Sequence, residues 1–316
     1  MVNYIIKRTI GAVLVVILVS FFVFSVVQLL PGDPVRIALG TEAPEADIQR
    51  IRAEKNLDRP APEQYVLWVN GLLHGDFGDS LIQDRTVLSM FKERLPRTLC
   101  IGIPSFLIAI VLGVICGIIC VIKRGKFSDT IVTLFTTLSV GTPQFWIGIL
   151  LIYIFSVRLK LLPMRGVVLP SESITGYLKS IILPVFCAFL HMFATVSRQT
   201  RSNMLEVVNQ DYIRTARANG ISEGKIIFGH ALKNALIPVV TVIGMQIRNI
   251  IGGSVLVETV FSVAGIGTMM TEAISNRDYW VLQSCVLLIS LFTVFCNLAV
   301  DIVYGYIDPR IREARG

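Results

Sequence analysis

The 25 residues Thr98–Ile122, TLCIGIPSFLIAIVLGVICGIICVI, contain no charged side chain. The hydrocarbon core of a bilayer is about 30 Å thick, and a helix of about 20 apolar residues crosses it. This stretch is therefore predicted to be a membrane-spanning helix. Five further runs of the same kind follow from the sequence: Thr9–Leu30, Thr130–Val157, Ser180–Ser197, Asn234–Val257 and Tyr279–Val300.

The composition of the whole chain agrees with these runs. Of the 316 residues, 53% are apolar and 16% are charged, whereas about 25% are charged in an average soluble protein. Among the 29 basic and 22 acidic residues, only Arg248 lies inside the six runs. This segregation excludes a soluble globular domain and a disordered chain. It predicts an all-α, polytopic membrane protein with six transmembrane helices.

The runs divide the chain into three parts. Residues 1–30 form the N-terminus and first transmembrane helix, 31–97 form an extracytoplasmic segment, and 98–316 form a five-helix core with a cytoplasmic loop over 198–233. Basic residues favour the cytoplasmic side of a membrane protein, when segments longer than about 60 residues are left out of the comparison. Both termini are therefore predicted to be cytoplasmic. The net charge of +7 then reflects topology, and no nucleic-acid partner is expected.

The extracytoplasmic segment 31–97 is long enough to hold its own helices. A charged helix is predicted over Pro44–Leu57, and an amphipathic helix over Glu63–Leu73. The run Gly75–Gly78 is typical of a turn. A third external segment, Glu258–Asp278, is predicted to form a re-entrant or interfacial hairpin.

Motifs for catalysis are absent from the sequence. The three histidines are far apart, and no cluster of cysteine and histidine suggests a metal site. The segment Gly220–Ile226 has three residues between its glycines where a phosphate-binding loop needs four. We therefore expect no enzymatic activity and no cofactor in this chain. The apolar runs also lack the buried carboxylate typical of ion-coupled transporters, so energy for transport would come from a partner.

The cytoplasmic loop 198–233 is predicted to form two helices with a break. The first covers Asp211–Asn219, Gly220 fits the left-handed position after it, and Ser222 can cap the second. The small and polar side chains on one face of the first helix, which would let a partner approach closely, are Tyr212, Thr215, Ala216 and Asn219. We interpret this helix as a docking lever between a cytosolic partner and the membrane helices. In the alternative interpretation, the basic side chains of a plain surface loop contact anionic lipid: Arg198, Arg201, Arg214 and Arg217.

Arg248 is the charge at membrane depth. An ionisable residue there commonly faces a bundle interior or an aqueous path, and the following Gly252-Gly253 permits a bend or close helix approach. Arg248 is thus a candidate for lining a substrate path. Pairing with a backbone carbonyl, or reaching toward an interface, is the alternative interpretation.

Several longer motifs extend these observations. They are Leu30-Pro31-Gly32-Asp33-Pro34, Leu57-Asp58-Arg59-Pro60, Gly75-Asp76-Phe77-Gly78-Asp79-Ser80, Asp211–Gly220, His230–Pro238, Gly252–Glu258 and Asp308–Arg312. With these motifs in this order, the chain resembles the integral-membrane permease subunits of bacterial ABC importers of the dipeptide/oligopeptide/nickel family. The resemblance covers Tyr4 to Arg312.

The resemblance implies a type I ABC importer permease fold in a bacterial inner membrane, with an EAA loop whose coupling helix contacts an ATPase. Arg214 stands at the position where the EAA motif names an acid, and Phe261–Gly265 departs from the Trp-Pro that relatives usually carry. The coupling residues expected on this basis are Tyr212, Arg214, Thr215, Ala216, Arg217, Asn219, Gly220 and Pro238. The path residues expected are Arg248, Gly252, Gly253 and Glu258.

The resemblance also implies partners: a second related permease, two ATP-binding subunits that hold ATP and Mg²⁺, an extracytoplasmic substrate-binding protein, and membrane lipid. The expected function is that of a permease subunit for di- or oligopeptides, with ATP hydrolysis by the partner subunits. The same machinery carrying nickel, a metal chelate or glutathione is the alternative within the class. An ATP-independent transporter or channel, and a membrane scaffold or sensor, are the alternatives of other classes.

Overall fold

The structure is a computed structural model that describes residues 2–29, 32–40 and 42–307. The motif 308–312 and residues 30 and 31 of the first motif lie outside this part. Within it, five helical stretches are long and apolar enough to cross a membrane: Tyr4–Leu29, Val87–Ile122, Ile174–Val208, Glu223–Ile250 and Tyr279–Ile302. Four of them lie in helices α1 (Val2–Leu29), α5 (Val87–Ile122), α8 (Ile174–Val208) and α14 (Tyr279–Ile307). The stretch Glu223–Ile250 has α11 (Leu232–Gln246) at its centre and includes the short helical elements on either side of it.

The predicted run Thr130–Val157 departs from a straight helix. It forms α6 (Phe127–Gly141), α7 (Gln144–Leu151) and the π-helix η1 (Ile152–Arg158), and the two halves are bent by 106°. Pro143 explains the break, because proline lacks a backbone N–H and drives the residue before it out of the helical region. Thr142 accordingly has φ −100° and ψ 131°. The predicted span Thr130–Val157 is therefore this bent pair of helices.

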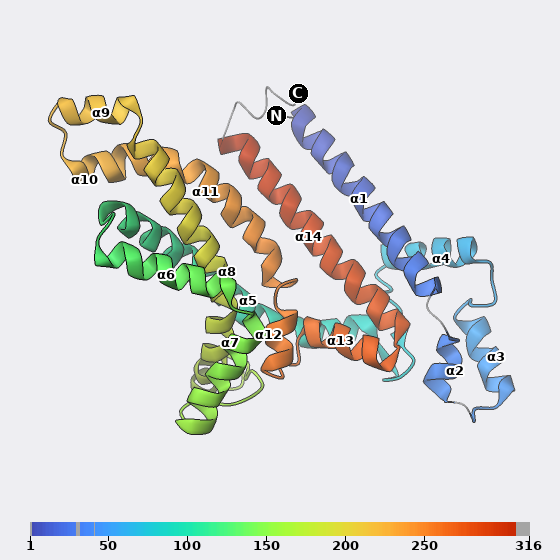
Figure 1. Ribbon diagram of the computed structural model, residues 1–316. Coiled ribbons are helices and arrows are strands. Elements are labelled where there is room, and N and C mark those ends of the chain that lie inside the picture. Colours follow the sequence, from blue (N-terminus) through green and yellow to red (C-terminus); the bar gives the residue numbers. More distant parts are fainter. Residues whose placement is uncertain (1, 30–31, 41, 308–316) are drawn as a thin grey trace.

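Helices α5 and α8 pack closely at the centre of the molecule (Figure 1). Gly113 and Gly117 of α5 form a small-xxx-small pattern of the kind that lets membrane helices approach. A Cβ atom at Gly113 would lie 2.9 Å from the side chain of Val196, and one at Gly117 would lie 2.5 Å from that of Thr200. Any larger side chain at these glycines would force the two helices apart.

The elements between α1 and α5, which we call the N-terminal segment, fold beside the end of α1 that is formed by its last residues. This segment contains α2 (Pro34–Leu39), α3 (Glu45–Glu54), α4 (Ala61–Leu73) and a two-stranded antiparallel hairpin of β1 (Asp79–Ser80) and β2 (Arg85–Thr86). The predicted helices are confirmed with small shifts of their ends. Helix α4 packs on α1 through aromatic rings, with Tyr65 edge-on to Phe24 at 5.4 Å and Trp68 stacked on Phe24 at 6.0 Å.

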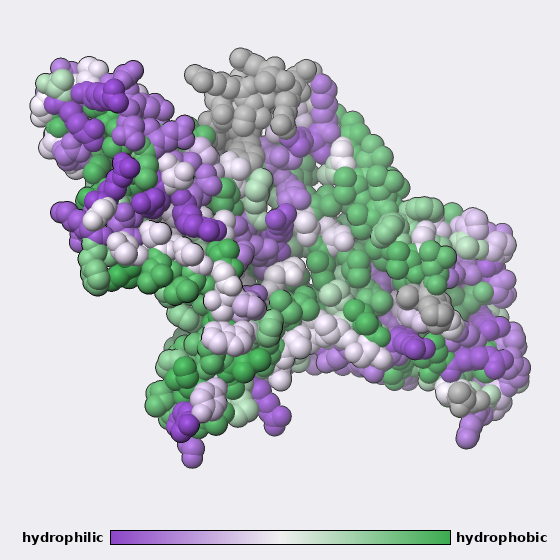
Figure 2. Space-filling model, in the orientation of Figure 1, coloured by the Kyte–Doolittle hydropathy of each residue, from purple (hydrophilic) through white to green (hydrophobic). Residues whose placement is uncertain are grey.

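The remaining elements are short: α9 (Asp211–Ala218), α10 (Glu223–Lys225), the π-helix η2 (Ile226–Ala231), the 3₁₀-helix η3 (Ile247–Ile250), α12 (Val255–Val260) and α13 (Ile266–Asn276). The start of α1 and the end of α14 lie on the same side of the molecule as α9, and α4 lies on the opposite side (Figure 1). We call these the α9 side and the α4 side. Figure 2 shows hydrophobic residues along α1 and hydrophilic residues gathered at α9 and around α2 and α3.

Candidate functional site

The loop on the α9 side has the predicted helix, turn and helix. Helix α9 ends at Ala218, and Gly220 has φ +76°, the left-handed conformation that favours glycine. No atom lies within 4 Å of a Cβ built at Gly220, so the glycine is required by backbone conformation and not by packing. Ser222 precedes α10 but makes no capping hydrogen bond with its side chain.

One face of α9 is anchored in an apolar cluster. Ile213 is fully buried there, together with Met204 of α8 and Ile226 of η2. Ala216 is half-buried and packs against the same cluster, so it faces inward, unlike the rest of its predicted set. Exposed side chains form the opposite surface of the helix and its end, which we call the α9 surface: Tyr212, Arg214, Thr215, Arg217 and Asn219.

Polar contacts fix α9 to the membrane helix that follows it. The Nδ2 of Asn234 in α11 donates to the Oη of Tyr212 at 2.9 Å. Arg217 donates to Glu223 across the Gly220 turn, at 2.6 Å and 3.4 Å, and this hydrogen bond raises the pKa of the Arg217 guanidinium. Arg214 contacts only its helical neighbour Asp211 among the ion pairs of the described residues. Helix α9 is thus held at both ends.

The residue Pro238 is placed apart from the α9 surface. It lies inside α11, where its side chain is exposed, and the link from this helix to α9 comes from Asn234 one turn earlier. Immediately before α11, the backbone forms the π-helix η2. The eight residues expected for coupling therefore do not form one surface.

A second ion pair, which the sequence analysis did not identify, lies on the same side. Arg201 of α8 donates to both carboxylate oxygens of Asp129 at 3.0 Å and 3.2 Å, and the backbone N–H of Gly125 donates to Asp129 at 3.1 Å. Asp129 is 7% exposed. These bonds tie the turn between α5 and α6 to α8. Arg201 is therefore engaged in the protein, in contrast to its role in the lipid-contact interpretation.

The expected path residues separate into two groups. Arg248 in η3 is exposed, as are Gly252 and Gly253 in the turn that follows, and Arg248 has no ion pair within the described part of the chain. Glu258 is different, because it is completely buried. The structure brings the first three together on one exposed turn and places Glu258 inside the protein.

Glu258 is the centre of a buried network on α12. Its carboxylate accepts hydrogen bonds from Thr98 Oγ1 at 2.7 Å, Ser254 Oγ at 2.9 Å and the backbone N–H of Thr268 at 3.0 Å. Three donors satisfy a carboxylate that would otherwise be very costly to bury. Because Thr98 belongs to α5 and Thr268 to α13, this network joins three helices. Glu258 ends the motif Gly252–Glu258, but nothing in this motif points to Thr98 or Thr268 as its partners.

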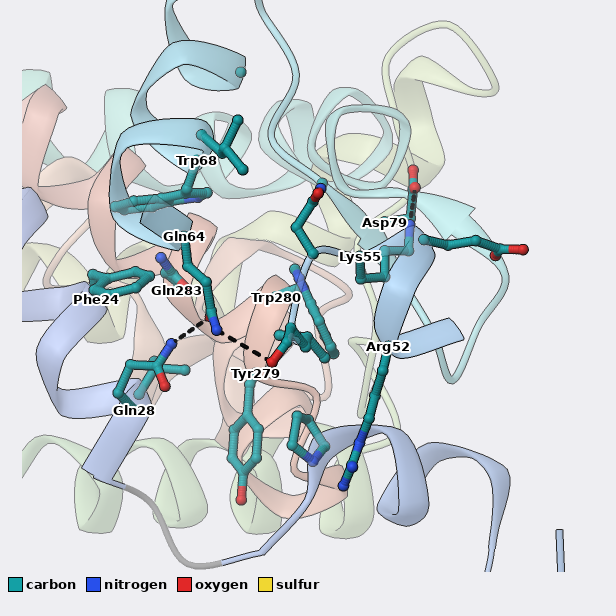
Figure 3. Close-up of a pocket in the computed structure, with 18 of the residues that line it drawn as sticks. Phe24, Gln28, Arg52, Lys55, Gln64, Trp68, Asp79, Tyr279, Trp280 and Gln283 are labelled. Carbon is teal, nitrogen blue, oxygen red and sulfur yellow. Dashed lines mark hydrogen bonds and ion pairs between the residues drawn. The ribbon is translucent and has the colours of Figure 1, made fainter. Parts of the chain in front are cut away.

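A cavity of about 670 Å³ lies on the α4 side (Figure 3). It is lined by the end of α1, the start of α2, the end of α3, one face of α4, the start of β1 and the start of α14. Phe24, Gln64, Trp68 and Gln283 line one part of it, and Arg52 and Lys55 line another. Most of the helices around this cavity were predicted from the sequence, but neither α2 nor the cavity was.

Two family models match the chain. Residues 109–313 match the binding-protein-dependent transport system inner membrane component, and residues 1–102 match the N-terminal part of the membrane component of such systems. Together they cover nearly the whole sequence.

Curated relatives match over almost their full length. A probable peptide ABC transporter permease protein of Sinorhizobium fredii is 38% identical over 98% of this chain and 99% of its own. A putative peptide transport system permease protein of Brucella abortus is 39% identical over 99% of both chains. A glutathione transport system permease protein of Escherichia coli K12 is 38% identical, again over 99% of both.

Solved structures support the same fold. The MetNI methionine ABC transporter in an inward-facing conformation matches with a TM-score of 0.53, at 15% identity, over 70% of this chain and 97% of the other. At this identity the likeness concerns the fold alone. It agrees with the arrangement of helices expected for a type I ABC importer permease.

Proposed function

Because the chain belongs to the family of binding-protein-dependent transport system inner membrane components, we propose that it carries short peptides across the membrane in an ATP-driven importer. The chain is a multi-pass permease component of an inner membrane. Peptide as the substrate is inferred from the relatives that bear peptide transport in their names. Glutathione is the second candidate, because another relative of equal identity is a glutathione permease.

The ATP-driven mechanism is supported by the contacts that hold α9 in place. Its inner face is buried through Ile213, and its ends are hydrogen-bonded to α11 and α10, while Thr215 and Asn219 remain exposed. A short helix held in this way transmits a push to the membrane helices without bending away. We infer that the α9 side is cytoplasmic, that an ATP-binding subunit docks on the α9 surface, and that ATP and Mg²⁺ are bound there and not by this chain.

Arg248, Gly252 and Gly253 are proposed to line the substrate path, since they share one exposed turn at the end of a membrane helix. A second related permease would complete the path, two ATP-binding subunits would drive it, and a binding protein would deliver peptide on the α4 side. A guanidinium attracts the terminal carboxylate of a peptide. Glu258 has no place in this proposal as a path residue, because its carboxylate is fully enclosed.

Reconstitution tests this function directly. The chain is placed in liposomes with its partner permease, ATP-binding subunits and binding protein, and uptake of a radiolabelled tripeptide and of glutathione is measured. We expect uptake only with ATP and all subunits present. Uptake by this chain alone would instead establish an ATP-independent transporter or channel, and binding of the ATPases without any uptake would favour a scaffold.

A further inference from the structure

The cavity on the α4 side has the size and composition of a ligand site. Its volume of about 670 Å³ falls in the range of pockets that hold small molecules, about 300–1,000 Å³. Among the described residues, its lining includes none of η3, the Arg248 turn or α12. Whatever binds in this cavity is therefore bound apart from the proposed path.

Amide side chains form one wall. Gln28 of α1 donates to Gln64 of α4 at 2.8 Å, and Gln64 donates to the backbone oxygens of Leu57 and Arg59. Gln283 of α14 is 7% exposed, and its Nε2 has no hydrogen-bond partner within the described chain. Figure 3 shows Gln283 between Phe24 and Gln64, at the edge of the cavity.

An unpaired amide nitrogen in a buried position is unfavourable and calls for an explanation. A ligand that offers a carbonyl or carboxylate to Gln283, after rotation of its amide, would remove this unfavourable state. The two donors of Gln64 are already used by backbone oxygens, so Gln28 and Gln283 are the amides of this wall that can meet the N–H and C=O groups of a peptide backbone.

Charges of both signs form the other wall. Arg52 donates to Asp33 at 2.5 Å, and Lys55 donates to Asp79 at 2.7 Å. Arginine has five N–H donors, and the ion pair with Asp33 uses one of them. This wall can therefore receive a carboxylate beside Arg52 or Lys55 and an ammonium group beside Asp33 or Asp79.

Aromatic rings complete the site. Phe24 and Trp68 are stacked at a centroid distance of 6.0 Å, and Trp280 of α14 lies against Gly78, the residue before β1. Such rings bury apolar side chains well. A phospholipid is the competing occupant. Its acyl chains would run along α1 and α14, where they would meet the polar side chains of Gln28 and Gln283. The combination favours a short zwitterionic molecule over a lipid.

We propose that this cavity is a second peptide-binding site, which holds a short peptide with free termini on the α4 side of the permease. The choice of peptide as ligand rests on the proposed function. Bound there, a peptide would bridge the N-terminal segment and α14 through Arg52 and Gln283. The site would thus sense peptide without moving it along the path.

Tryptophan fluorescence can test this proposal on the full chain. The protein contains three tryptophans; Trp68 and Trp280 line the cavity, and Trp146 of α7 is 50% exposed elsewhere. In the Trp146→Phe background, in phosphatidylcholine nanodiscs, trialanine is titrated while the emission is followed. We expect a saturable shift, and at least tenfold weaker binding of N-acetyl-trialanine amide, which lacks both terminal charges.

Two variants make the test specific. Gln283→Leu should weaken trialanine binding at least tenfold and at the same time raise the melting temperature of the unliganded protein, because it removes the unpaired amide. The matched control Gln199→Leu, in α8 on the α9 side, should leave binding unchanged. The opposite behaviour of binding and stability in Gln283→Leu distinguishes a ligand site from a residue that only supports the fold.

Defined outcomes would overturn the proposal. They are the absence of a trialanine response, an equal response in Gln283→Leu, or a response to phosphatidylethanolamine in the nanodisc that trialanine does not displace. The last result would identify a lipid site. Because the assay contains no ATPases and no binding protein, its failure leaves ATP-driven uptake untouched. Conversely, binding without uptake by the complete transporter would refute the proposed function alone.

Discussion

The contact between Gly265 and the carboxylate of Glu258 yields a sharp prediction. A Cβ atom at Gly265 would overlap the Glu258 side chain, with its Oε1 only 2.5 Å away. Gly265 has φ −105°, which alanine adopts freely, so any effect of Gly265→Ala comes from this overlap. Overpacking of this kind destabilises a folded protein by about 1–3 kcal/mol.

The variant Glu258→Ala removes the carboxylate that a Cβ atom at Gly265 would overlap, but it leaves hydrogen-bond donors unpaired. The backbone N–H of Thr268 and the hydroxyl of Thr98 lose their acceptor, whereas Ser254 keeps a second bond to the oxygen of Ile251. An unsatisfied buried donor is unfavourable by about 1–3 kcal/mol, so we expect a loss of about 3 kcal/mol in all. In this background Gly265→Ala should lower the stability by less than about 1 kcal/mol.

Thermal unfolding of the full chain in detergent micelles measures the effect. Cys120, Cys187 and Cys285 are buried, whereas Cys100, Cys116 and Cys296 are partly exposed. With the last three replaced by serine in every variant, reaction with a thiol-reactive fluorophore reports unfolding. With about 2–4 °C per kcal/mol, Gly265→Ala should lower the melting temperature by roughly 2–12 °C. Its effect in the Glu258→Ala background should be below about 4 °C.

Additivity is the result that would refute this reasoning. If Gly265→Ala lowers the melting temperature equally in both backgrounds, the two residues are not in contact as described. Gly224→Ala serves as the control, because no atom lies within 4 Å of the Cβ it would add. A large effect of this control would show that the assay responds to any glycine replacement.

Three further predictions concern transport and pH. Gly220→Val strains a backbone with φ +76° by about 1–2 kcal/mol, so it should reduce ATP-driven uptake while ATP hydrolysis continues. Gly224→Val is the matched control. Equal uptake by both variants would contradict the role of α9 as a lever. Arg248→Ala should abolish most peptide uptake without changing the melting temperature, because the side chain is exposed. Arg248→Lys should retain part of the uptake. Full uptake by both variants would exclude a path role for Arg248. Burial raises the pKa of Asp278, opposed by the hydrogen bond from Ser80. The folded protein therefore binds this proton more tightly than the unfolded chain, and stability should fall as the pH rises from 3.8 through the higher folded pKa. Asp278→Asn should remove this slope from the unfolding free energy, and an unchanged slope would rule Asp278 out as its source.

The membrane helices could be predicted from the sequence because their signal is local. Each span needs only a run of apolar residues of sufficient length, and the break at Gly220 needs only one glycine after a helix. The bend at Pro143 was also visible in the sequence, but the apolar composition continues through it and concealed the change of direction. A pattern based on hydropathy detects which residues are in a membrane and not how the backbone turns there.

The buried polar network could not be predicted for a different reason. Thr98 and Glu258 are separated by 160 residues, and neither belongs to a motif that implies the other. Arg201 and Asp129 are likewise distant in sequence. Long-range pairs such as these depend on how helices pack, so they emerge only with the three-dimensional structure. The same holds for the cavity, which is formed by residues of six separate elements.

The close packing of α5 on α8 has a mechanical consequence. Helix α8 has 35 residues, so it is about 52 Å long. At its α9 end, the ion pair of Arg201 with Asp129 joins it to the α5–α6 turn. Since no gap separates the two helices at Gly113 and Gly117, they should rotate as one rod. A tilt of about 10° at the α9 end displaces the far end of a rod of this length by roughly 9 Å. A displacement of that size is wider than a peptide backbone, and it would be reached with every contact between α5 and α8 preserved.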